Sequence, residues 1–349
     1  MRCPPYPSRP VRYSIALAIM NPFCGSVLGS ALFAAPSSSS LERQNMRALE
    51  NSIPDQTGRT ALVTGTGGLG FQVAQQLARA GAHVIIAGRN ASKGAEAVRS
   101  ISAAAPAGSI AFESVDLASL QSIEALAARL ADIPAIDVLV NNAGIMSPPS
   151  RKTTADGFEL QFGVNYLGHF ALTGRLLPVL RRSAAPRVVN VTSLAHRYAK
   201  LDFSDLQQEW SYRAGKVYCQ SKLAQALFTR ELQRRSDLEG WSLTSVAAHP
   251  GAAQTNLFQN DQASMSVMSR ITTGVFLPLF GHSAEDGAAS IIYAASTTDV
   301  SPGCLYGPTG LNKMKGPPGR QEFGKAALDE SVAQRLWAVS EKLAQFSFS

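Results

Sequence analysis

From Thr60 onward, short runs of β-branched residues alternate with longer amphipathic segments rich in alanine and leucine. This alternation is typical of a parallel sheet covered by helices on both faces. It predicts strands at 61–64, 83–87, 110–115, 138–141, 187–192 and 243–248, with a short one near 305–306. Helices are predicted at 69–79, 92–104, 120–131, 158–180, 216–235, 284–295 and 326–344. Because no repeat or second core is visible, we expect residues 46–349 to form a single doubly wound α/β (Rossmann) domain with about seven parallel strands.

Residues 1–45 form an extension of different character. Three arginines precede a mostly apolar stretch, residues 15–35, and a serine run follows it. This order resembles a secretion signal or anchor, although Asn21, Pro22 and Gly25 would interrupt a spanning helix. The alternative is that translation starts at Met46. We expect a cytoplasmic protein, with membrane attachment or export through residues 15–35 as the alternatives.

The formal charge of +7 does not indicate a nucleic-acid partner. Four arginines and one glutamate in residues 1–45 supply +3 of it, and no Lys/Arg run that could follow a phosphate backbone appears elsewhere. The cysteines, at positions 3, 24, 219 and 304, form no Cys-x-x-Cys or Cys/His pattern, so no metal site is expected. The expected partner is a small molecule, and the sequence leaves homo-oligomer formation open.

A glycine-rich turn, Thr64-Gly65-Thr66-Gly67-Gly68-Leu69-Gly70, joins the first predicted strand to the first helix. Backbone N–H groups at a helix N-terminus bind phosphate, and missing side chains allow a close approach. The turn therefore predicts a dinucleotide site that includes Gly65, Gly68, Leu69 and Gly70.

Arg89 follows the second strand, where dinucleotide sites distinguish a ribose 2′-hydroxyl from a 2′-phosphate. A guanidinium pairs with phosphate, Lys93 adds charge one turn later, and residues 87–90 contain no carboxylate for a hydroxyl. The sequence thus favours NADP (NADPH) over NAD. Asp116, followed by Leu117 after the third strand, could accept from the adenine amino group or cap the next helix.

Tyr218 and Lys222 are spaced to lie on one face of a helix, one turn apart. A cation near a phenol favours the phenolate and so lowers a tyrosine pKa from its usual value of about 10. The spacing alone arises often by chance. Here it follows Asn141-Asn142-Ala143-Gly144, Asn165 and Ser193 in chain order, which makes Tyr218 a candidate proton donor or acceptor.

This combination of motifs resembles the short-chain dehydrogenase/reductase (SDR) family over residues 58–310. Its retinol-dehydrogenase-like branch is the most similar, through the run from Asn165 to Phe170, Val191-Thr192-Ser193 and the long interval between Ser193 and Tyr218. The resemblance implies that Tyr218 exchanges a proton with the substrate while Ser193 hydrogen-bonds the substrate oxygen. It also implies that Lys222 lowers the tyrosine pKa and binds the nicotinamide ribose, and that Asn165 holds a proton-relaying water.

The resemblance also implies further cofactor contacts, which are Asn142, Ala143, Gly144, Pro250, Gly251 and Thr255. The reaction implied is hydride transfer between NADP and a carbonyl or alcohol. Apolar residues after Ser193 and in a lid at 252–282 favour a lipophilic substrate, although they could simply pack on the sheet. Two alternatives remain: a non-catalytic NADP sensor on the same fold, and a membrane-associated reductase.

One feature departs from the family pattern Thr-Gly-x-x-x-Gly-x-Gly, because one residue is missing between Gly65 and Gly68. A lost backbone N–H predicts weaker cofactor binding, which is the outcome that we expect. The alternative is that Gly67 and Gly68 adopt positive φ and carry the chain along a different path to the phosphates.

Overall fold

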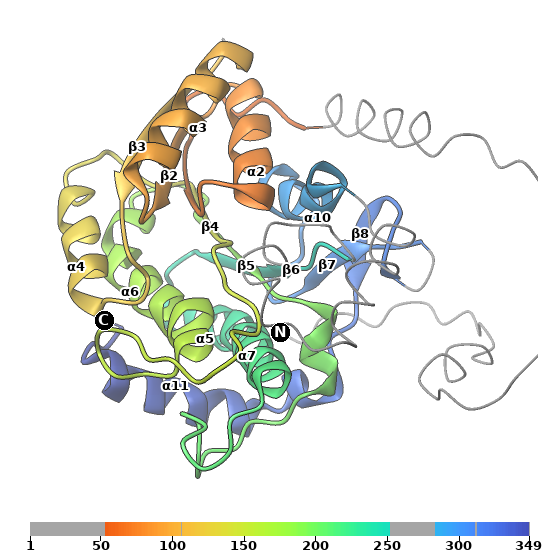
Figure 1. Cartoon of the computed structure of the whole chain (residues 1–349). Coiled ribbons are helices and arrows are strands. Elements are labelled where there is room, and N and C mark those ends of the chain that lie inside the picture. Colours follow the sequence, from red (N-terminus) through yellow and green to blue (C-terminus); the bar gives the residue numbers. More distant parts are fainter. Residues whose placement is uncertain (1–52, 106, 252–282, 311–312, 349) are drawn as a thin grey trace, which may run out of the picture.

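The computed structural model describes residues 53–105, 107–251, 283–310 and 313–348. They form one sheet between two layers of helices (Figure 1). The strand order is β3-β2-β1-β4-β5-β6-β7-β8; the first seven are parallel, and β8 is antiparallel to β7. The predicted doubly wound α/β sheet is confirmed, with one extra strand at its edge.

The strands are β1 (Thr60–Thr64), β2 (His83–Gly88), β3 (Ser109–Ser114), β4 (Val138–Asn141), β5 (Arg187–Val191), β6 (Thr244–Ala248), β7 (Leu305–Pro308) and β8 (Pro318–Gln321). The helices are α2 (Gly68–Arg79), α3 (Ala91–Ala104), α4 (Leu120–Arg129), α5 (Leu160–Phe162), α6 (Gly168–Leu180), α7 (Ala214–Glu239), α10 (Ala284–Ser296) and α11 (Glu330–Ala344). A π-helical turn (Gly163–Leu167) and two 3₁₀ turns (Leu194–Tyr198 and Lys325–Leu328) complete the described elements.

Both faces of the sheet are buried, which explains the continuous apolar runs of its strands. In β1, Leu62 packs in the layer of α4, α6, α7 and α11, whereas Val63 packs in the layer of α2, α3 and α10. The same alternation continues in β4, where Leu139 and Val140 face opposite layers. The helices of the two layers lie on opposite sides of the strands in Figure 1. Because helices cover both faces of the central strands, a ligand can reach them only at their ends, where the loops begin.

Two predicted helices differ from the structure, and one strand was not predicted. The predicted helix 158–180 is wrong as one regular helix, because a π-helical turn separates α5 from α6 and the N–H of Gly168 reaches the carbonyl of Gly163. The predicted helix 326–344 divides at Asp329, whose side chain caps α11 by accepting from the N–H of Val332 at 3.1 Å. The strand β8 was not predicted, because Pro318 and Gly319 are unusual in strands.

Several expectations fall outside the described residues. These are the extension 1–45, the lid 252–282 and Thr255. Among the residues that the structure does describe, no helix combines the length and apolarity needed to cross a bilayer.

Candidate active site

The predicted site residues gather where the central parallel strands end. In a doubly wound sheet this carboxyl edge is where ligands bind, because successive loops leave the sheet side by side. Gly65 follows β1, Asn142 follows β4, and Ser193 follows β5 by two residues. The edge thus brings together residues that lie far apart in the sequence.

The glycine turn after β1 has the geometry of an anion site. Gly65 and Gly68 have φ values of +99° and +53°, and Gly67, the N-cap of α2, offers no side-chain cap. The first helical hydrogen bond of α2 is donated by Phe71, so the N–H groups of residues 68–70 precede it and need another acceptor. A Cβ on Gly70 would lie 2.3 Å from the carbonyl oxygen of Gly65. The free amides and this tight closure fit a pyrophosphate.

Thr64 connects this turn to the loop after β4. Its Oγ1 accepts from the N–H groups of Asn142 at 2.9 Å and Ala143 at 3.0 Å. The Nδ2 of Asn142 in turn donates to the carbonyl of Thr64 at 2.7 Å. A Cβ on Gly144 would lie 3.1 Å from Oδ1 of Asn165 and 3.7 Å from Nζ of Lys222. The loop therefore runs from the glycine turn to the candidate catalytic residues.

Arg89 lies at the exposed end of β2, beside the glycine turn. The turn reaches this strand, since a Cβ on Gly88 would lie 3.0 Å from the methyl group of Thr66. Within the described part of the chain, the side chains of Arg89 and Lys93 form no hydrogen bond or ion pair, so both charges are free for an anionic ligand.

Asp116 does not cap α4, which was one of the two roles that the sequence left open. Its Oδ1 accepts from the N–H of Ala118 at 2.9 Å, while Ser119 caps α4 by accepting from Ser122 at 3.2 Å. Leu117 is 8% exposed and packs in the core. Asp116 therefore shapes the turn before α4, and its contact with adenine stays a prediction.

The side chain of Ser193 lies close enough to the Tyr218 phenol to oppose the rise of its pKa. Ser193 comes from the β5 edge and Tyr218 from the first turns of α7. Lys222, one turn further along α7, donates from Nζ to the carbonyl of Val191 at 2.9 Å and lies 5.9 Å from the centre of the Tyr218 ring. These contacts bring two hydroxyls and one buried ammonium together at one point of the sheet edge.

Burial dominates the protonation of this group. It raises the pKa of Tyr218 to about 12, against the opposing effect of the Ser193 side chain. It also lowers the pKa of Lys222 to about 8. Lys222 is not among the groups that shift the pKa of Tyr218 here, since its ammonium is directed at the Val191 carbonyl, and its expected effect on the phenol stays a prediction.

Asn165 holds the β4 loop against α7. Its Oδ1 accepts from the N–H of Ile145 at 2.8 Å, and its Nδ2 donates to the Ile145 carbonyl and to Oγ of Ser221, both at 3.0 Å. Its backbone carbonyl, released by the π-helical turn, accepts from Nε2 of Gln225 and is 3.0 Å from Nδ1 of His169. The proposed water on Asn165 stays a prediction.

Two buried residues of this network were not predicted as site residues. His169 is fully buried, and its Nε2 lies 3.0 Å from Oγ1 of Thr64. Gln225 is also fully buried, and it contacts both His169 and the Asn165 carbonyl. His169 belongs to the run that carries the family resemblance, and Gln225 lies three residues beyond Lys222. Neither position indicates a function by itself, because their shared partner, the Asn165 carbonyl, is made available by the π-helical turn.

Gly251 closes the loop after β6. It has a φ of +70°, its N–H donates to Nδ1 of His249 at 3.2 Å, and a Cβ there would lie 2.3 Å from the carbonyl oxygen of Met314. Pro250 and Gly251 therefore form a tight turn at the same sheet edge. Their contact with a cofactor stays a prediction.

The insertion after Ser193 was expected to cover the site with apolar side chains. Phe203 instead packs against the core, with the guanidinium of Arg335 4.2 Å from its ring centre. Tyr198 and Trp210 are 84% and 76% exposed. The described insertion therefore supplies no continuous apolar cover, and the lipophilic substrate must be argued on other grounds.

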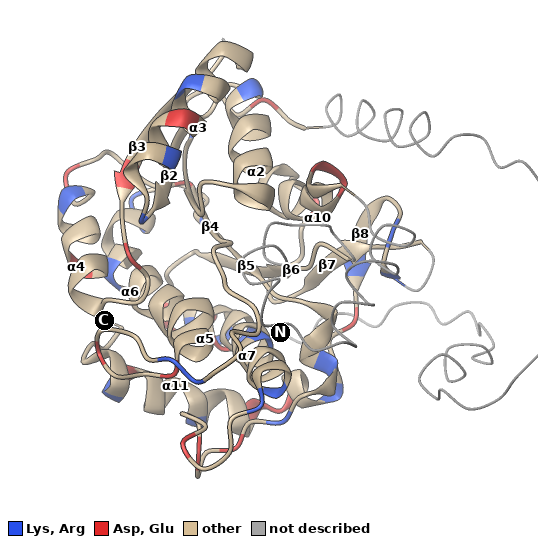
Figure 2. Ribbon diagram, viewed as in Figure 1, with Lys and Arg blue, Asp and Glu red and all other residues tan. Residues whose placement is uncertain are grey.

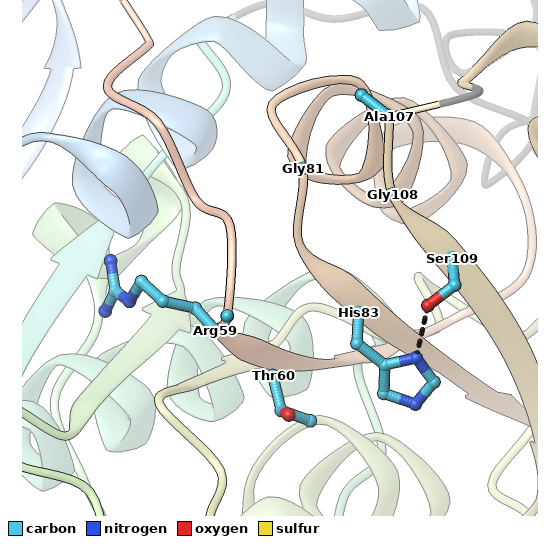
Figure 3. Close-up of a pocket in the computed structure, with 8 residues that line it drawn as sticks. Arg59, Thr60, Gly81, His83, Ala107, Gly108 and Ser109 are labelled. Carbon is cyan, nitrogen blue, oxygen red and sulfur yellow. Dashed lines mark hydrogen bonds between the residues drawn. The ribbon is translucent and has the colours of Figure 1, made fainter.

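A shallow pocket of about 350 Å³ lies at the opposite edge of the sheet (Figure 3). Its lining includes Arg59, Thr60, His83 and Ser109, which belong to or precede the amino-terminal ends of β1, β2 and β3. Nδ1 of His83 lies 2.6 Å from Oγ of Ser109. Because the glycine turn and Tyr218 lie at the other edge, this pocket is separate from the candidate site. No cluster of metal-ligating side chains occurs within the described residues.

Comparison with known proteins agrees with this geometry. The family model for short chain dehydrogenases matches residues 59–266. Human retinol dehydrogenase 13 is 42% identical over 289 residues, 82% of this chain and 84% of that protein. This chain therefore belongs to the short-chain dehydrogenase family, within its retinol-dehydrogenase-like branch, and is an oxidoreductase.

Two solved structures support the fold. One is a putative uncharacterized protein from Mycobacterium paratuberculosis, with a TM-score of 0.70 and 36% identity, covering 86% of this chain and 98% of that one. The other is Pseudomonas aeruginosa RhlG in an active-site complex with NADP, with a TM-score of 0.56 and 27% identity, covering 71% and 94%. The family uses nicotinamide cofactors, which agrees with the free amides of the glycine turn.

The positive φ of Gly68 bears on the shortened turn. The alternative path of the chain was expected to use a positive φ at both Gly67 and Gly68, but only Gly68 has one, since Gly67 is extended with a φ of −140°. The turn at Gly68 still lets residues 68–70 present their amides without the missing residue. We therefore expect that inserting one glycine between Gly65 and Thr66 leaves NADPH binding unchanged or weakens it. Calorimetric titration of the two proteins with NADPH checks this. If the insertion tightens binding at least ten-fold, about 1.4 kcal/mol of binding free energy, the missing residue does weaken cofactor binding, as first expected.

Proposed function

We propose that this enzyme transfers a hydride between NADP(H) and the carbonyl or alcohol carbon of a lipophilic small molecule, with Tyr218 as the proton donor or acceptor. The observation that carries the proposal is the convergence of the Ser193 side chain and the Tyr218 phenol beside the buried Lys222. Two hydroxyls that meet at one point can both contact one substrate oxygen. A protein that only sensed NADP would have no need of that arrangement.

Each residue of the group has a distinct task in carbonyl reduction. A nicotinamide coenzyme held by the glycine turn would supply the hydride for the carbonyl carbon. Ser193 donates a hydrogen bond to the substrate oxygen and stabilises the negative charge that develops there. Tyr218 delivers its hydroxyl proton to the same oxygen, and its high pKa of about 12 keeps that proton in place at neutral pH. Lys222 as an ammonium then favours the phenolate that is left.

The supporting residues hold this group together. Asn165 fixes the β4 loop through its two hydrogen bonds to Ile145. The missing side chain of Gly144 lets the loop pass beside Lys222. For oxidation of an alcohol the same contacts operate in reverse, with Tyr218 accepting the proton.

NADP is the proposed coenzyme because Arg89 and Lys93 have free charges beside the glycine turn. Replacing Arg89 by aspartate should reverse the preference, since a carboxylate repels the 2′-phosphate and accepts from a 2′-hydroxyl. Fluorescence titration of both reduced coenzymes measures it. Wild-type protein that binds NADH as tightly as NADPH would refute the charge argument, and Lys93→Gln is the milder control.

An isoprenoid alcohol or aldehyde is the proposed substrate class. The support is the 42% identity to a protein named retinol dehydrogenase. A screen that follows NADPH absorbance with retinal, shorter isoprenoid aldehydes and propanal tests this. We expect kcat/KM to rise with the apolar length of the aldehyde, because each buried CH₂ contributes about 0.8 kcal/mol. A preference for propanal would exclude a lipophilic substrate.

A further inference from the structure

His196 lies directly behind Ser193, in the 3₁₀ turn Leu194–Tyr198. Its side chain is fully buried. The carbonyl oxygen of Ser193 accepts from the backbone N–H of His196 at 3.0 Å and from its Nδ1 at 2.6 Å. Both donors to this carbonyl therefore come from one residue, and they fix the peptide plane that leads away from Ser193.

The other ring nitrogen of His196 is held from the C-terminal part of the chain. The N–H of Gly324 donates to Nε2 at 3.0 Å. The adjacent Phe323 lies edge-on to the imidazole, with ring centres 6.1 Å apart. The neighbouring Arg197 donates to the carbonyl of Glu322, and a Cβ on Gly324 would lie 3.0 Å from the Cα of Arg197. The segment 322–324 is thus packed closely against the turn after Ser193.

These partners define one tautomer of His196. Nδ1 must carry the proton, because its partner is a carbonyl, and Nε2 must be unprotonated, because its partner is an N–H. A charged imidazolium would direct an N–H at the N–H of Gly324. Burial accordingly lowers the pKa of His196 to about 4. The ring is neutral at physiological pH and both of its nitrogens are satisfied.

We propose that His196 is a positioning residue for Ser193. The Nδ1–H of His196 fixes the Ser193 peptide so that the serine hydroxyl faces Tyr218. The proposal rests on the proposed function, in which the Ser193 hydroxyl donates to the substrate oxygen. The Ser193 side chain has its own constraint, since Oγ accepts from the N–H of Ala195 at 3.2 Å within the same turn. Holding the peptide plane therefore also holds the hydroxyl. The role of Gly324 is to anchor the far side of the ring.

Two substitutions separate the two ring nitrogens. The amide of asparagine occupies the place of Nδ1, so His196→Asn keeps the donor to Ser193 and loses the contact with Gly324. The amide of glutamine reaches the place of Nε2, so His196→Gln keeps an acceptor for Gly324 and loses the donor to Ser193. We expect His196→Asn to retain kcat within about three-fold, and His196→Gln to lose roughly 10–100-fold, because a small misplacement of a reacting group is costly.

NADPH affinity and thermal stability show whether His196 acts on catalysis or only on folding. NADPH affinity, measured by fluorescence, should stay within about two-fold of wild type in both variants, since the glycine turn is untouched. Thermal unfolding of both variants gives the stability cost. Equal kcat in the two variants, or kcat losses that follow the loss of thermal stability, would overturn the proposal.

A measurement on the wild-type protein covers the case in which a variant does not fold. Two-bond ¹H–¹⁵N correlation spectra report the tautomer of each histidine, and His196 should be the neutral Nδ1–H form from pH 6 to 8. An Nε2–H form would overturn the proposal. Ser193→Ala distinguishes failure of the proposed function: full turnover of retinal by that variant would remove Ser193 from the reaction, whatever the His196 variants do.

Discussion

Replacing Tyr218 by phenylalanine should lower turnover by roughly 10²–10⁴-fold, the usual effect of losing a general acid. The aromatic ring is kept, and only the hydroxyl next to Ser193 is lost. NADPH affinity should stay near that of wild type, because the glycine turn and Arg89 are unchanged. Steady-state kinetics with an identified substrate, together with NADPH titration, measure both quantities.

The Ser193→Ala variant is the matched control for this result. Since the two side chains lie close together and are proposed to contact one substrate oxygen, they should act as a unit, and the double variant should be only slightly slower than the slower single variant. Activity above a tenth of wild type in Tyr218→Phe would contradict the proton-donor assignment. Additive losses in the double variant would show that the two groups act independently.

Acid should destabilise this protein steeply below pH 6.5, because three buried histidines are held neutral. Burial lowers the pKa of His169 and His196 to about 4 and that of His249 to about 3. The nearby cations act in the same direction: Lys222 on His169, Arg197 on His196, and Arg197 with Lys313 on His249.

The sign follows from proton uptake. Unfolded histidine titrates near 6.5, so between about pH 6.5 and 4 the unfolded chain binds protons that the folded chain does not. The free energy of unfolding therefore keeps its full value above pH 6.5 and decreases as the pH falls towards the folded pKa values of these histidines. Three such groups remove on the order of 6 kcal/mol by pH 5, a large part of the 5–15 kcal/mol typical of folded proteins. Glu159 opposes the trend, since burial raises its pKa.

Urea unfolding at a series of pH values tests this prediction. We expect His249→Gln to make the fall in unfolding free energy less steep between pH 6.5 and 5. His83 is exposed, so His83→Gln is the control and should leave the slope unchanged. A wild-type unfolding free energy that is constant from pH 7 to 5 would contradict the argument.

The positions of the central strands could be predicted closely because both faces of the sheet are buried there and their side chains are mostly apolar. The strand at Val138–Asn141 has the predicted bounds, and those at Thr60–Thr64 and His83–Gly88 differ by one residue. The strand at Pro318–Gln321 could not be predicted, since it depends on pairing with β7 rather than on its own residues. The π-helical turn at Asn165 likewise depends on tertiary contacts, in which Gly168 lies against Leu117.

The candidate site divides in the same way. The order of Gly65, Asn142, Ser193 and Tyr218 was enough to predict one common sheet edge, because parallel strands place their ends together. The protonation of Tyr218 and Lys222 was not predictable, since burial decides it and burial is a property of the folded chain. The same is true of His169 and His196, which are polar residues with no apolar pattern of their own. In Figure 2 the positions of the charged residues are spread over many helices and loops of the fold.

Hydride transfer itself can be followed with NADPH deuterated at both C4 positions of the nicotinamide. Wild-type enzyme is incubated with this coenzyme and retinal, and the alcohol product is analysed by mass spectrometry, with Tyr218→Phe as the control. If the enzyme acts as proposed, each alcohol molecule carries one deuterium on the former carbonyl carbon, and the control forms far less product. Tight NADPH binding without deuterium transfer to retinal or to any aldehyde of the screen would contradict the proposal and favour a protein that binds the coenzyme without turning it over.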